Sequence, residues 1–224
     1  MSVERSILLK ILEFRRMLID ELSSLHGISE ERLREILEKY SGLVDINGRI
    51  VVAVKPLELA LKLLEQGVSV ERISRVVSWR DFERLAAYIM SENKYLVESN
   101  MTLTAPVRLE VDVTGVDPAS GLTVIVDCKH WSHNTRGRLI EAGVRHLERV
   151  AKIIQYYDHL KSKYRILEYA RSVIPVILTL QTPPLRVYEG VLYVNAREFN
   201  EFLVNIRYVM DVFEVKPLHL PSRL

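Results

Sequence analysis

Two short strand-like stretches joined by a turn constrain the fold of this chain more than any other feature. The first is Arg108–Thr114 and the second is Leu122–Trp131. The connection between them, Gly115–Gly121, is rich in the turn residues that are typical of a hairpin. The start of the second stretch, Leu122–Val126, is almost wholly apolar. This pattern predicts a central strand that is covered on both faces and has charged residues only at its end.

Charged side chains stand at the ends of both predicted strands. Side chains alternate along a strand, so Asp127 and Lys129 share one face while Cys128 points to the other. By the same rule Glu110 and Asp112 share a face. If the two strands pair as a hairpin, two carboxylates and one ammonium converge at its open edge. Mg²⁺ takes oxygen ligands and usually needs only one or two carboxylates, so Asp112 and Asp127 are candidate ligands, with Glu110 as an alternative further from the edge.

This arrangement resembles the PD-(D/E)XK superfamily of restriction-endonuclease-like nucleases, and it is most similar to the Mrr-type and archaeal Holliday-junction-resolvase branches. The family pattern is a helix with a glutamate, a strand that ends in an aspartate, and a strand that ends in (D/E)-x-K. Here these are Glu83, Asp112 and Asp127-Cys128-Lys129, and the resemblance covers roughly residues 78–210. Val111 stands where the family has the proline of its name.

The resemblance implies a metal-dependent nuclease that hydrolyses phosphodiester bonds of nucleic acid, with a DNA endonuclease as the expected activity and Mg²⁺ or Mn²⁺ as the cofactor. Asp112, Asp127 and the backbone carbonyl of Cys128 would hold the ion, and Glu83 would complete or extend that shell. Lys129 would position the hydrolytic water. Two alternatives remain open. One is a non-cleaving module with a nuclease-like fold that binds a DNA structure or a partner, and the other is a regulatory protein whose acidic residues form surface salt bridges.

The loop after Lys129 is a candidate contact for nucleic acid. Residues 129–149 include five basic side chains (129, 136, 138, 145 and 149) and two acidic ones (141 and 148). Basic groups beside an aromatic ring suit contact with a phosphate backbone, although an ordinary solvated loop fits the composition equally well. The candidate contact residues are His130, Trp131, His133, Arg136 and Arg138.

Residues 1–77 are predicted to form an all-α winged helix-turn-helix-like domain. Helical patterns cover about 3–15, 17–27 and 29–40, and Asn47-Gly48 is a strong hairpin signal between two short strands. A further helix is expected over 57–66 and a short connecting one over 68–77. The third helix has four acidic residues against three basic ones, which is unfavourable in a DNA groove. Besides reading DNA, the domain is a candidate for protein contact, packing or formation of a homodimer.

Residues 78–224 are predicted to form a restriction endonuclease-like mixed β-sheet flanked by helices, so the chain as a whole is α/β. The expected order is a helix over 79–93, three strands, a long helix over about 139–164, strands near 172–180 and 190–194, and a closing helix over 196–210. The long helix is expected to turn one apolar stripe to the sheet and to keep Arg145, Arg149 and Lys152 on its other faces. That stripe consists of Ile140, Val144, Leu147, Ala151 and Ile154.

Composition limits the class of protein. The chain is 48% hydrophobic and 27% charged with a formal net charge of +2, which is typical of a globular protein. Its apolar runs are shorter than the roughly 20 residues of a membrane span, and its start lacks a signal-peptide pattern. We therefore expect a cytoplasmic protein without a membrane partner. The single cysteine, Cys128, excludes an internal disulfide and is expected to be a buried apolar side chain.

Overall fold

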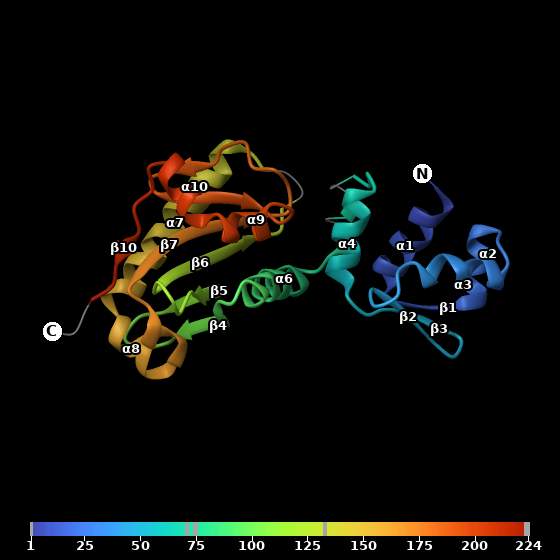
Figure 1. Cartoon of the computed structure of the whole chain (residues 1–224), viewed down its shortest axis with the longest axis horizontal. Coiled ribbons are helices and arrows are strands. Elements are labelled where there is room, and N and C mark those ends of the chain that lie inside the picture. Colours follow the sequence, from blue (N-terminus) through green and yellow to red (C-terminus); the bar gives the residue numbers. More distant parts are fainter. Residues whose placement is uncertain (1, 70–71, 74–75, 132–133, 222–224) are drawn as a thin grey trace. The chain divides into compact units, whose positions relative to one another are not determined.

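The computed structural model describes residues 2–69, 72–73, 76–131 and 134–221. It contains two compact units, Met1–Phe82 and Glu83–Leu224, and the division between them lies within helix α6 (Trp79–Glu92). Among these residues, the first unit has a three-stranded sheet and the second a seven-stranded one. Figure 1 shows the helices and strands of each unit. The chain is therefore a mixed α/β protein. Within the described ranges, no helix is long and apolar enough to cross a membrane.

The first unit is built from helices around a small antiparallel sheet with the strand order β1-β3-β2. Its elements are α1 (Val3–Phe14), β1 (Arg16–Leu18), α2 (Ile19–His26), α3 (Glu30–Glu38), β2 (Val44–Asn47), β3 (Ile50–Ala53) and α4 (Pro56–Glu65). The expected hairpin is present, with Gly48 at φ +64° in the turn. The expectation that the second helix begins near Met17 is wrong, because residues 16–18 pair with β3 instead. Of the expected connecting helix, residues 72–73 and 76 are helical and 70–71 and 74–75 lie outside the described residues.

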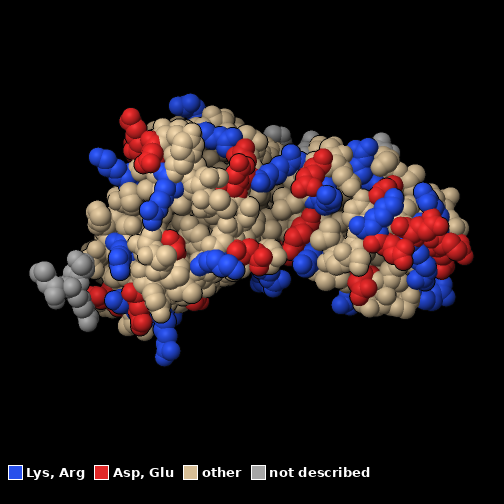
Figure 2. Space-filling model, viewed as in Figure 1, with Lys and Arg blue, Asp and Glu red and all other residues tan. Residues whose placement is uncertain are grey.

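Helix α3 shows how local signals shape the first unit. Ser29 is its N-cap, and the hydroxyl oxygen accepts a hydrogen bond from the backbone N–H of Arg32 at 3.2 Å. The buried face consists of Leu33, Ile36 and Leu37, while the acidic residues after the first turn are exposed. Acidic side chains gather over this part of the unit (Figure 2). The exposed face of α3 is thus a poor surface for a phosphate backbone.

The second unit is a mixed sheet with helices on its faces. Its elements after α6 are β4 (Leu96–Leu103), β5 (Leu109–Val116), β6 (Leu122–Lys129), α7 (Arg136–Gln155), α8 (Tyr157–Lys163), a 3₁₀ turn (Arg165–Tyr169), β7 (Ser172–Thr179), β8 (Val187–Tyr188), β9 (Val191–Asn195), α9 (Phe199–Val204), α10 (Ile206–Val212) and β10 (Leu218–His219). The strand order is β4-β5-β6-β7-β9-β8, and β10 pairs with β7. Strands β4, β5 and β6 are antiparallel neighbours, whereas β6, β7 and β9 run parallel. Helix α7 makes the crossover between the parallel strands β6 and β7.

The long helix expected over residues 139–164 is two helices, α7 and α8, which are separated at Tyr156. The prediction of which α7 residues face the sheet is also wrong. Val144 is 38% exposed, and none of the five predicted positions is buried. The buried face of α7 lies to one side of that stripe and consists of Leu139, Ala142, Gly143, His146, Val150 and Ile153. Steric fit explains why this face of α7 is the buried one. A Cβ on Gly143 would lie only 2.0 Å from Tyr193 Oη, so the glycine permits close contact between α7 and β9.

The closing helix expected over 196–210 is also two short helices, α9 and α10. They lie on the face of β9 opposite α7. Tyr193 donates a hydrogen bond to the carbonyl of Leu139 on α7 at 3.0 Å, so the alternation along the strand turns Leu192 and Val194 to the other side. Those two residues line a cavity together with residues of α9 and α10. The sheet is thus covered on both faces here.

Candidate active site

The candidate site lies where the β5–β6 hairpin opens. The antiparallel ladder between the two strands begins with the pair Val113↔Val126. Asp112 precedes that pair on β5, and Asp127 follows it on β6, so the two carboxylates stand just beyond the last paired residues. The structure therefore brings Asp112 and Asp127 together as the sequence predicted. Their charges interact, since Asp127 is among the causes that raise the pKa of Asp112.

Asp112 is joined to β6 through the backbone of Cys128. Its Oδ2 accepts a hydrogen bond from the Cys128 N–H at 2.7 Å. The N–H and C=O of a strand residue point to the same side, so the Cys128 carbonyl also faces β5, beyond the end of the ladder. The Cys128 side chain is fully buried, and burial raises the pKa of its thiol well above the usual value. This residue therefore contributes backbone groups to the site, while its thiol is a core group.

Asp127 is surrounded by positive charge. Only 3% of the residue is exposed, and it has ion-pair contacts from Lys129 Nζ to Oδ2 at 2.7 Å and from Arg149 Nη1 to Oδ1 at 2.9 Å. Both of its neighbours, Lys129 from the same strand and Arg149 from α7, keep some solvent exposure.

His146 completes this cluster from the buried face of α7. Its Nε2–H donates to the carbonyl of Ile125 at 3.0 Å, and Arg149 donates to its Nδ1 at 3.1 Å. A carbonyl can only accept and a guanidinium can only donate, so these two contacts assign the proton to Nε2 and make the imidazole neutral. Burial lowers the pKa of His146 to about 4, which agrees with this assignment. Sequence reasoning missed both His146 and Arg149, because it oriented α7 by its apolar residues alone.

The two aspartates of the site have different acidities. Burial, followed by the neighbouring charge of Asp127, raises the pKa of Asp112 to about 6. Burial would also raise the pKa of Asp127, but His146, Lys129 and Arg149 together hold the pKa below its ordinary value. Two neighbouring carboxyl groups with separated pKa values are typical of functional sites.

Two further carboxylates differ in their relation to the site. Glu83 on α6 is 8% exposed, and its charge is among those that raise the pKa of Cys128, which places it near the end of β6. Glu110, the alternative ligand, is exposed on β5 two residues before Asp112. The burial of Glu83 and the exposure of Glu110 favour the set Glu83, Asp112 and Asp127 over one that includes Glu110.

The basic loop after β6 carries a stacked aromatic ring. Trp131 is half-buried against the cluster that includes Leu139 and Tyr193, and the guanidinium of Arg138 lies over its ring, 4.3 Å from the centroid. Lys129 Nζ is 5.8 Å from the same centroid. The remaining predicted contact residues are His130, which is half-buried, Arg136, which is exposed at the start of α7, and His133, which lies outside the described residues.

The metal predicted for this site can be tested against its donors. Asp112, Asp127 and the Cys128 carbonyl are hard oxygen donors, and the charge of the buried Asp127 raises the proton affinity of the half-buried Asp112, so the pair favours a nearby divalent cation. However, in the part of the chain that the structure describes, no three His, Cys, Asp or Glu side chains are grouped closely enough to hold a metal ion. The residues fit an ion such as Mg²⁺, which keeps several waters and needs only one or two carboxylates.

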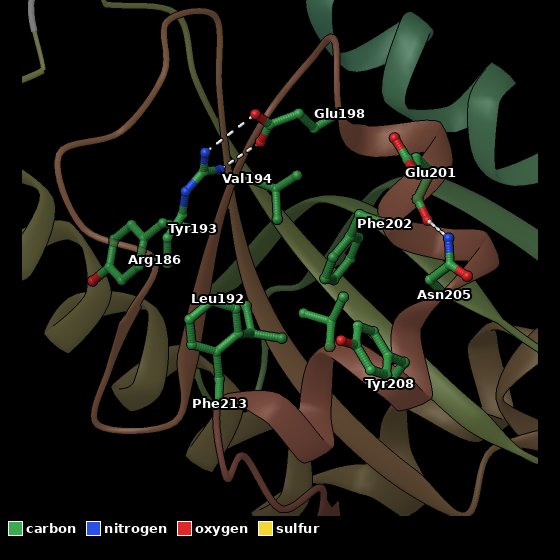
Figure 3. A pocket seen from close by; sticks show the side chains of 11 residues that line it. Arg186, Leu192, Tyr193, Val194, Glu198, Glu201, Phe202, Asn205, Tyr208 and Phe213 are labelled. Atoms are coloured by element: carbon green, nitrogen blue, oxygen red, sulfur yellow. Dashed lines mark hydrogen bonds and ion pairs between the residues drawn. The ribbon is translucent and has the colours of Figure 1, made fainter.

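A cavity with a mainly apolar lining lies away from this site. It has a volume of about 490 Å³ and is formed by β9, α9 and α10, with Leu192, Phe202, Tyr208 and Phe213 among its lining residues. Figure 3 shows the Arg186–Glu198 ion pair beside it. None of the candidate catalytic residues lines this cavity. The candidate site is therefore defined by its charged groups and by the end of the hairpin.

Comparisons with known proteins add little to this geometry. No family model matches the chain, and no curated protein matches it. Among solved structures, the chain is similar to protein VC1899 from Vibrio cholerae, with 12% sequence identity and a TM-score of 0.35. The match covers 93% of this chain and 51% of the other, so this chain spans about half the length of that protein. A similarity of this degree supports no statement about function.

Proposed function

We propose that this protein is a metal-dependent nuclease that hydrolyses phosphodiester bonds, with DNA as its substrate. The observation that carries the proposal is the convergence of Asp112, Asp127, Lys129 and the Cys128 backbone at the open end of the β5–β6 hairpin. The mixed sheet supports a restriction endonuclease-like assignment for the second unit. The order α1-β1-α2-α3-β2-β3 supports a winged-helix assignment for the first unit.

Charge balance explains why the site suits a cation and a phosphodiester. At formal charges, Asp112, Asp127 and Glu83 contribute three negative charges, and Lys129 and Arg149 contribute two positive ones, which leaves a net charge of −1. A bound divalent ion changes this sum to +1, which is complementary to the single negative charge of a phosphodiester. The loaded site would therefore attract the substrate more strongly than the metal-free site does.

The residues of the chain then have separate tasks in the proposed reaction. Asp112, Asp127 and the Cys128 carbonyl would hold Mg²⁺ or Mn²⁺, with Glu83 completing or extending the set. The ion would supply a Lewis acid that polarises the phosphoryl group and acidifies bound water. Lys129, fixed beside Asp127 at 2.7 Å, would orient the attacking water or stabilise charge on the phosphorus oxygens. Trp131, Arg136 and Arg138 would contact the strand that carries the scissile bond.

Cleavage of labelled DNA tests this proposal. Linear duplex, branched and single-stranded substrates are incubated with Mg²⁺, Mn²⁺ or EDTA. We expect products only with metal, and a loss of about a hundredfold or more in rate for Asp127→Ala and Lys129→Ala. Lys152→Ala, which removes an exposed lysine from α7, is the matched control and should cut normally. Asp112→Ala and Glu110→Ala separate the two alternative ligands, because only the first should abolish cutting.

A second function is favoured by one observation. Asp127 already has two counter-cations without any metal, and no preformed three-carboxylate group is found within the described ranges. A carboxylate that is already paired in this way suits a nuclease-like module that binds a DNA structure or a partner without cutting it. If wild-type protein binds DNA, leaves every substrate intact with either metal, and binds equally well as Asp127→Ala, this second function replaces the first.

A further inference from the structure

Arg149 occupies a position that its sequence context did not predict. It was expected on a face of α7 away from the sheet, yet only 27% of its side chain is exposed and its Nη1 reaches Asp127 in the candidate site. Arg145, one turn earlier on the same helix, pairs with Glu141 instead and is 55% exposed. The two arginines have the same charge, but only Arg149 reaches the candidate site.

The position of Arg149 is fixed by a chain of contacts between β6 and α7. The backbone of Ile125 accepts from His146, His146 accepts from Arg149 Nη1, and the same Nη1 donates to Asp127. Ile125 and Asp127 are two residues apart on β6, so the contacts begin and end on one strand. Because His146 is neutral, it acts as an acceptor without adding a charge that would repel the guanidinium. Arg149 is thus held by one nitrogen in a defined orientation.

This anchoring leaves one edge of the guanidinium available. Arginine has five N–H donors, and the two on Nη1 account for both contacts of Arg149. The Nε–H and one Nη2–H point in the same direction and form a fork, and neither has an acceptor among the residues that the structure describes. The side chain keeps partial exposure. A fork of this kind matches two oxygens of a phosphate group.

We infer that Arg149 is a phosphate-binding residue of the candidate site, which receives two oxygens of a substrate phosphodiester on its Nε–Nη2 fork while Nη1 stays on Asp127 and His146. This inference rests on the proposed function and deepens it. It assigns recognition of the scissile phosphate to α7 as well as to the hairpin. It also gives His146 a role as a positioning residue, because the imidazole orients the guanidinium without contacting substrate.

The test separates the contribution of the Arg149 charge from that of its Nε–Nη2 fork. It measures DNA binding under conditions without cleavage. Fluorescence anisotropy with a labelled oligonucleotide is recorded in EDTA over a range of salt concentrations for wild type, Arg149→Gln, Arg149→Lys and the control Arg145→Gln. We expect Arg149→Gln to weaken binding about tenfold and to lower the salt slope by about one, as for a lost phosphate contact. Arg149→Lys should keep the slope but weaken binding several-fold, because it retains the charge and loses the fork.

The outcomes separate this inference from the proposed function. Equal losses for Arg145→Gln and Arg149→Gln would mean that only general charge matters, and full activity and affinity of Arg149→Lys would mean that the fork is not used; either result overturns the inference. Cleavage by wild type in Mg²⁺, measured in parallel, reports on the proposed function by itself. Thermal unfolding in EDTA checks that each variant is folded. If Arg149→Gln does not fold, the comparison of Arg149→Lys with wild type still decides the question.

Discussion

Replacing Asp112 by asparagine should stabilise the protein while removing its proposed activity. The carboxyl group of Asp112 is ionised at neutral pH in a place that disfavours charge, because it is partly buried and close to Asp127. The amide oxygen of asparagine can still accept the hydrogen bond from the Cys128 N–H, so the substitution removes the charge and retains this contact. Opposite effects on stability and activity are typical of a functional site whose charges repel each other in the absence of ligand.

The size of the effect follows from the pKa. Burial and Asp127 raise the pKa of Asp112 from 3.8 to about 6. Each unit corresponds to about 1.4 kcal/mol, so the ionised carboxylate destabilises the folded state by about 3 kcal/mol at most. The folded state binds this proton more tightly than the unfolded state, so the free energy of unfolding falls as the pH rises from about 4 to about 6 and then levels off. The variant should lack this contribution to the pH dependence.

Urea unfolding in EDTA measures the difference. A Trp79→Phe background leaves Trp131 as the fluorophore, which lies in the same unit as Asp112. We expect Asp112→Asn to exceed the background protein by about 2 to 3 kcal/mol near pH 7.5 and to match it near pH 4. Glu110→Gln, on the same strand but exposed, should change stability by less than about 0.5 kcal/mol at either pH. A less stable Asp112→Asn protein, or a gain of equal size at both pH values, would refute the reasoning.

Three other substitutions test separate parts of the structure. Ser29→Ala removes the hydroxyl that accepts a hydrogen bond from the Arg32 N–H at the start of α3. The free energy of unfolding of the first unit should therefore fall by about 1 kcal/mol, as measured by urea unfolding. Gly143→Ala places a Cβ 2.0 Å from Tyr193 Oη and should cost about 1 to 3 kcal/mol, part of which Tyr193→Phe should restore in the double variant; no recovery would place the strain elsewhere. Trp131→Leu should weaken binding of single-stranded DNA about tenfold in anisotropy, and an unchanged affinity would remove the ring from the proposed interface.

Local signals in the sequence were sufficient for much of the first unit. The helical pattern from residue 29 predicted α3, and Asn47-Gly48 predicted the β2–β3 hairpin, because capping by Ser29 and turn formation depend on a few neighbouring residues. Strand β1 was missed for the opposite reason. Arg16 pairs with Val52, 36 positions further along the chain, and a segment of three residues has no periodicity of its own that would indicate such a pair.

The candidate site was predictable in part. Alternation along a strand was enough to place Asp127 and Lys129 on one face, and the apolar run before them indicated a buried central strand, which β6 is. The register of the hairpin then brought Asp112 beside Asp127. Arg149 and His146 could not be assigned in the same way, because their place depends on which side of α7 faces the sheet.

The sequence by itself determined the positions of the hairpin, its apolar strand and the charged residues at its end, because the period of a strand and the chemistry of turns are local properties. Only the tertiary structure decided which face of α7 is buried. Small residues such as Gly143, which permit close packing against Tyr193, and the polar His146, which finds a buried acceptor on Ile125, outweigh the larger apolar side chains of the predicted stripe. A hydropathy pattern does not report close contacts or hydrogen bonds between segments that are distant in the sequence. These contacts bring Arg149 to Asp127.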